Sequence, residues 1–171
     1  MINPDHDNAL WRFSLKVYAA PGVEAECLML QTTHDIDINL LLFCAWAGAE
    51  RGWRLAPAEL DRMRQAVREW QEGVVKPLRS ARRAMKALAM QNPTAHDLRS
   101  RIAVDEIEAE RIEQGMLFAL ASTEAGLSSN SGRATDAFRI VRQNIALLID
   151  GRTEALPEAL IAEALRVAPT H

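Results

Sequence analysis

The chain has 171 residues, of which 49% are hydrophobic and 25% charged, and a formal net charge of -3. A chain of this length can bury enough apolar surface to fold without metals or disulfides. An acidic total argues against nonspecific binding to nucleic acid, which needs a positive field. The longest apolar run, residues 40–49, is about half of a bilayer span, so we expect a buried helix and no membrane partner.

Glycine and proline divide the chain into amphipathic segments, and no run of alternating β-branched residues predicts a strand. The sequence therefore predicts an all-α protein. In chain order, the predicted helical segments cover about residues 7–19, 21–32, 33–52, 57–77, 78–91, 94–125, 136–150 and 157–167.

The third of these segments is apolar nearly all round, which is typical of a central helix packed on several sides. Asp35 or Thr33 can cap it, and Asp37 suits its first turn because the helix dipole favours negative charge there. The next segment has apolar residues at spacings of three and four, the pattern of a helix packed lengthwise on a neighbour. We expect Pro77 to end or kink that segment. We also expect the helices beginning near residues 57 and 94 to pack along the central one.

The predicted architecture is a compact bundle of five to six helices with a C-terminal helical arm. Residues 1–125 form the predicted core domain. Residues 126–171 form a linker, rich in glycine and serine over 126–133, followed by an arm that folds back onto the core or onto a second subunit.

Two charged stripes lie at helical spacing. Basic residues on the segment 78–91 include Arg79, Arg82 and Arg83, and the segment from 94 carries glutamates at 106, 110 and 113. Asp105 falls within an apolar stripe and needs a partner there. We interpret the stripes as facing each other, with Asp105 paired to Arg82 or Arg83 in a helical hairpin or across a dimer. Two alternatives stay open, namely solvated faces and an arginine clamp for a phosphate or carboxylate ligand.

A candidate pocket follows from the central helix, where Asn39, Trp46 and Glu50 share one face. These polar groups could line a small cavity, or they could be hydrogen-bonded core residues. The candidate ligand-binding set combines this face with the charged stripes: Asn39, Trp46, Glu50, Arg79, Arg82, Arg83 and Asp105.

Motifs of catalysis, metal binding and cofactor binding are missing from the sequence. The four histidines are scattered, and no GxSxG, GxGxxG, GxxxxGK or HExxH pattern occurs. The two cysteines, Cys27 and Cys44, lie in apolar segments without CxxC spacing, which predicts core thiols in a reducing compartment. The N-terminal residues lack the regions of a secretory signal, so we expect a cytoplasmic protein. Because the motifs above are missing, we expect no catalytic residue, metal or cofactor.

Several stretches taken together resemble an uncharacterised family of small all-helical bacterial proteins, a domain of unknown function. They are residues 10–18 (LWRFSLKVY), 21–23 (PGV), 35–46 (DIDINLLLFCAW), 74–79 (VVKPLR) with Trp70 and Arg82–Arg83, and 108–114 (EAERIEQ). The resemblance covers about residues 10–120 and leaves the C-terminal arm unmatched. It implies a helical fold and assigns no activity or residue role.

The function that we predict is a non-enzymatic interaction or regulatory protein that self-associates, as a homodimer, with a further protein partner possible. The alternative is an anionic-ligand binder or enzyme with a pocket between the central and the arginine-rich helix. Nucleic acid is a disfavoured partner because of the acidic total charge.

Overall fold

Helices account for all the regular structure in the residues that the computed structural model describes, 7–123 and 136–168. The all-α prediction is confirmed, whereas the count of five to six helices is not. The α-helices are α1 Ala9–Tyr18, α2 Val23–His34, α3 Ile38–Ala49, α4 Pro57–Trp70, α5 Lys76–Ala84, α6 Lys86–Ala89, α7 Pro93–Thr123, α8 Ala137–Leu148 and α9 Glu158–Val167. A π-helical segment, η1 (Gln71–Val75), joins α4 to α5, and a short 3-10 helix, η3 (Thr153–Ala155), precedes α9.

Helix α3 lies at the centre of the core, as its sequence predicts. Asp37, and not the predicted Asp35 or Thr33, caps it by accepting from the backbone N–H of Asn39 at 2.8 Å, and residues 39–48 are all buried. Its most extensive packing is against α8, whereas α4 packs mainly along α7. Gly48 permits the α3–α8 approach, because a Cβ at this position would lie 2.9 Å from the backbone of Val141. The expectation that α4 runs along α3 is therefore wrong.

Pro77 does not end the helix that begins at Pro57. The backbone N–H of Lys76 donates to the carbonyl of Gln71, five residues back, and α5 continues through the proline. A proline inside a helix removes one backbone donor and crowds the preceding turn, and the wider π turn accommodates both effects. This turn places both Gln71 and Val75 on the buried side.

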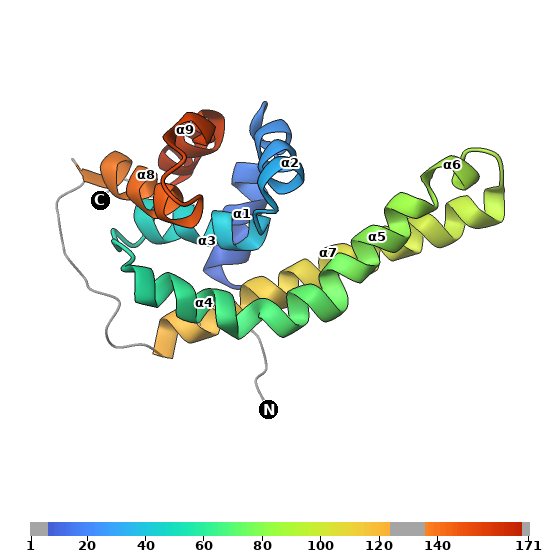
Figure 1. Ribbon diagram of the computed structural model, residues 1–171, viewed down its shortest axis with the longest axis horizontal. Helices are drawn as coiled ribbons and strands as arrows, with labels where there is room; N and C mark the ends of the chain where they lie inside the picture. The colour runs from blue at the N-terminus through green and yellow to red at the C-terminus, as the bar shows by residue number, and fades with distance from the viewer. Residues whose placement is uncertain (1–6, 124–135, 169–171) are drawn as a thin grey trace.

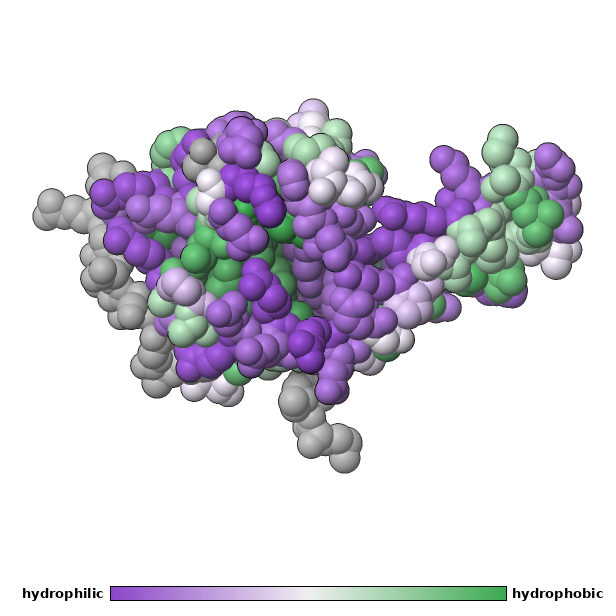
Figure 2. Space-filling model, in the orientation of Figure 1, coloured by the Kyte–Doolittle hydropathy of each residue, from purple (hydrophilic) through white to green (hydrophobic). Residues whose placement is uncertain are grey.

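Helices α5, α6 and the first half of α7 form a hairpin that projects away from the rest of the molecule (Figure 1). The bundle is thus less compact than predicted. Apolar side chains gather near the end of the hairpin (Figure 2), where Leu88 is 58% and Met90 83% exposed. We call residues 76–101 the hairpin below.

The last helices, α8 and α9, pack within the same chain. Ile145 of α8 and Leu160 of α9 are fully buried and belong to the core cluster that α3 dominates, and α9 also contacts α1 and α2. The predicted boundary at residue 126 lies outside the described residues, and the division into two domains stays a prediction. No described helix combines the length and apolar character needed to cross a bilayer. Cys27 and Cys44 are buried and unpaired, as predicted, and burial raises the pKa of each thiol to about 12.

Candidate functional site

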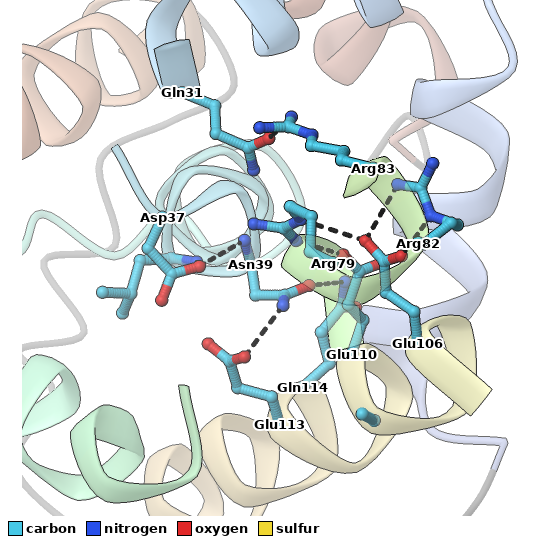
Figure 3. Close-up of polar contacts among 12 residues, drawn as sticks. Gln31, Asp37, Asn39, Arg79, Arg82, Arg83, Glu106, Glu110, Glu113 and Gln114 are labelled. Atoms are coloured by element: carbon cyan, nitrogen blue, oxygen red, sulfur yellow. Dashed lines mark hydrogen bonds and ion pairs between the residues drawn. The ribbon is translucent and has the colours of Figure 1, made fainter. Parts of the chain in front are cut away.

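The arginines of α5 face the glutamates of α7 at the base of the hairpin (Figure 3). Arg79 donates from Nε to Glu106 at 3.0 Å and from Nη2 to Glu110 at 2.5 Å. Arg82 donates to Glu106 through both Nε and Nη2. The prediction that the two stripes meet in a helical hairpin is confirmed. We call these four residues the charged cluster.

The prediction that Asp105 pairs with Arg82 or Arg83 is wrong. Asp105 is exposed and makes no ion pair with Arg82 or Arg83 in the described structure, whereas the adjacent Glu106 is only 5% exposed. One residue turns a helix by about 100°, so Asp105 and Glu106 cannot both face α5. Arg83 instead donates to the side-chain oxygen of Gln31 on α2 at 3.1 Å.

The pKa values of the two glutamates of the charged cluster are shifted in opposite directions. Burial opposes ionisation of Glu106, but the hydrogen bonds from Arg82 and Arg79 outweigh it and hold the pKa of Glu106 below its usual value. For Glu110 the balance is reversed, because burial outweighs the attraction of Arg79 and raises its pKa. Arg79 therefore donates to one carboxyl group with a lowered pKa and to one with a raised pKa.

Asn39 lies in a second, more deeply buried group of polar side chains. It donates from Nδ2 to Glu113 at 3.1 Å and accepts from Gln114 Nε2 at 2.9 Å (Figure 3). Glu113 is fully buried, and its pKa is raised to about 10 by that burial and by the neighbouring Asp37. Glu113 is thus neutral at pH 7, and its Oε1 has no hydrogen-bond partner among the described residues. We call Asp37, Asn39, Glu113 and Gln114 the buried polar cluster.

The remaining predicted site residues, Trp46 and Glu50, lie elsewhere. Glu50 follows Asn39 by eleven positions, which is about 16 Å along a helix. Trp46 is 2% exposed, donates from Nε1 to Glu50 at 3.0 Å, and packs edge-on against Trp53. The structure therefore brings Asn39 close to the arginines but leaves Trp46 and Glu50 as a packing and hydrogen-bonding pair.

A groove of about 730 Å³ runs between the hairpin and the body of the protein. Its side formed by the hairpin and the following part of α7 carries Arg79, Arg82, Arg83, Lys86, Arg99, Ala103, Glu106, Ile107, Glu110 and Gln114. Its body side carries Trp11, Ser14, Leu15, Tyr18, Ala19, Glu24, Leu28, Gln31, Ile38, Asn39 and Leu42. Three apolar side chains on its rim are exposed: Leu15 (53%), Leu28 (41%) and Ile107 (54%). A concave surface with apolar walls and a few polar groups is typical of a binding site.

Polar atoms without partners also line this groove. Ser14 Oγ and Gln114 Oε1 are buried and make no hydrogen bond within the described residues, and neither does the Nε of Arg99. Arg83, Lys86 and Arg99 have no carboxylate partner among those residues, unlike Arg79 and Arg82. The groove thus combines exposed apolar surface with uncompensated positive charge.

The contribution of α1 to the groove was not predicted, although the sequence contains a signal for it. Leu10, Phe13 and Val17 face the core, as one apolar stripe of an amphipathic helix should. Trp11, Leu15 and Tyr18 form a second stripe at spacings of four and three, and this stripe lines the groove. A second apolar face on a short helix indicates a surface beyond the core.

Comparisons with known proteins supply no residue roles for these clusters. Within the described residues, no group of three or more His, Cys, Asp or Glu side chains could hold a metal ion. No curated protein and no solved structure shows significant similarity to the chain. Residues 9–117, well over half of the chain, match the model of a protein family of unknown function, DUF2390, and the chain therefore belongs to this family.

Proposed function

We propose that the protein is a non-enzymatic interaction module whose groove binds an acidic amphipathic helix of a partner protein. The observation that carries this proposal is the pairing, in one concave surface, of the exposed apolar rim with Arg83, Lys86 and Arg99. Burying the rim would drive association, and the cations would select a partner with carboxylates beside its apolar face.

Two designed helical peptides with the same leucine face test this proposal, one carrying glutamate and the other lysine at its remaining positions. We expect fluorescence anisotropy to show saturable binding of the acidic peptide, weakened by salt, and at least about tenfold weaker binding of the basic one, a difference of about 1.4 kcal/mol. Equal binding of both peptides, or binding of neither, would contradict the proposal.

A matched pair of variants locates the binding surface. Leu28 and Met29 are neighbours on α2 with similar exposure, 41% and 42%, but only Leu28 lines the groove. Leu28→Glu should abolish binding of the acidic peptide, because it places a charge on the apolar rim and repels glutamates. Met29→Glu should bind as the unmodified protein does. Binding that survives Leu28→Glu would place the peptide elsewhere.

Self-association is a second candidate, favoured by the distribution of charge. Residues 76–101 contain seven Lys or Arg and one Asp, a formal charge of +6, whereas the whole chain carries -3, which leaves -9 for the remainder. The exposed end of one hairpin could therefore dock onto the acidic body of a second copy. Light scattering over a concentration series should show a dimer that Met90→Asp disrupts, and a monomer at every concentration would exclude it.

A reducing, cytoplasmic location is part of the same proposal. Two buried, unpaired thiols support it, because oxidising compartments favour disulfides. A fluorescent fusion that partitions with a cytoplasmic marker would agree with this location, and secretion would contradict it.

A further inference from the structure

A second and smaller hollow lies on the other side of Arg79. Its volume is about 330 Å³, and it is enclosed by the α2–α3 connection, by α4 and η1, and by the turn that follows α8. Its apolar lining consists of four residues, each at most 9% exposed: Ile36, Leu40, Val67 and Leu148. A hollow of this size accommodates a small metabolite and is too small for a peptide helix.

Gln71 is the most unusual residue of this hollow. It is only 6% exposed, and its Oε1 is buried without a hydrogen-bond partner among the described residues. The π turn before Pro77 places this side chain on the buried side of η1. A buried amide oxygen without a donor costs folding free energy, so such an atom in the wall of a hollow indicates a ligand that supplies the missing donor.

Most charged groups around the hollow already have partners. Lys76 lies 2.8 Å from Glu72 and 3.3 Å from Asp35, and Arg79 belongs to the charged cluster. Two lining groups of opposite sign lack an ionic partner within the described structure. Among the described residues, Arg68 on α4 has no carboxylate within ion-pair distance, and Asp37 accepts from the backbone N–H groups of Asn39 and Leu40 without contacting a cation.

We infer that this hollow binds a small zwitterion of the amino-acid class. The guanidinium of Arg68 matches the fork of a carboxylate. An ammonium group can donate to the carboxylate of Asp37 and to Oε1 of Gln71, which supplies the donor that the buried amide lacks. The apolar lining receives the side chain of the ligand. This inference concerns a different surface from the groove and does not depend on the peptide proposal.

Calorimetric titration and thermal unfolding with each of the common amino acids test the inference. We expect at least one amino acid to bind and to raise the Tm of the full chain. The corresponding acid without its amino group, and the amine without its carboxylate, should each bind at least about tenfold more weakly. Binding by none of the amino acids at millimolar concentration, or equal binding of either analogue, would overturn the inference.

Variants connect that binding to Arg68 and Gln71. Arg68→Leu should lose binding at least about tenfold, and Arg101→Leu, a change of an exposed arginine on the hairpin, should not. Gln71→Leu should weaken binding while keeping or raising the Tm of the free protein, because it removes an unpartnered buried amide. This separates loss of binding from loss of folding. Unchanged affinity in either Arg68→Leu or Gln71→Leu would contradict the site.

Discussion

Two polar clusters along α7 shift the pKa of a glutamate in opposite directions. Glu106, in the charged cluster, lies opposite two arginines and has a lowered pKa. Glu113, seven residues later, lies beneath α3 with Asn39 and Asp37, and its pKa is raised to about 10. Glu110 lies between them, with burial and Arg79 acting in opposite directions. Position on a helix face therefore does not determine the ionisation of a carboxyl group, whereas the facing helix does.

The largest effect is expected from Glu113→Gln. Because the folded protein keeps the proton of Glu113 to about pH 10 and the unfolded chain releases it near pH 4.5, wild-type stability falls as pH rises between these values. Glutamine mimics the neutral acid, so the variant should be more stable by about 2–4 kcal/mol at pH 8 and nearly unchanged at pH 4. Urea unfolding at both pH values measures this. Equal stability at pH 8 would mean that Glu113 is ionised in the folded protein.

A reference that does not involve the two glutamates comes from the α3–α8 contact, where Gly48 approaches the backbone of Val141. Gly48→Ala should lower the free energy of unfolding by about 1–3 kcal/mol at every pH, because the new methyl group overlaps the backbone of Val141. Gly73→Ala is the matched control, since nothing lies within 4 Å of its would-be Cβ. We expect it to stabilise the protein by about 0.5–1 kcal/mol. The same sign for both variants would show that the close approach of α3 and α8 is not rigid.

Glu106→Gln should act in the opposite direction to Glu113→Gln. A carboxylate with a lowered pKa contributes stability above its ordinary pKa and loses it as pH falls, so the variant should be less stable at pH 7. We expect a loss of about 1–2 kcal/mol, reduced by high salt because Arg82 is partly exposed. Hydrogen exchange should localise the loss to the hairpin. A loss spread equally over α3 and α8 would contradict a local role.

The smallest effect is expected from Glu110→Gln. Burial outweighs the attraction of Arg79 for this carboxyl group and raises its pKa, so its replacement should cost less than that of Glu106 and change the free energy of unfolding by less than about 0.5 kcal/mol at pH 7. Denaturant unfolding beside Glu106→Gln measures the difference. A loss as large as that of Glu106→Gln would show that the two carboxylates share Arg79 equally.

Particular residues show how far the sequence could predict the candidate site. Helical spacing correctly placed Arg79 and Arg82 opposite the acidic stripe, because residues three and four apart share a face. Helical spacing indicated Asp105 instead of Glu106 as the buried partner of the arginines, because the rotation of a helix about its axis depends on the neighbouring helices. It also joined Asn39 to Glu50, because a shared face does not reveal that the partners of a helix change along its length.

The sequence by itself determined the helices and their apolar stripes, because these depend on residues within one or two turns of each other. The tertiary structure alone decided that α8 covers α3, that the chain continues through Pro77 as a π turn, and that Glu106 and Glu113 differ in charge. Each of these depends on packing and electrostatics between segments distant in the sequence, which local periodicity does not encode.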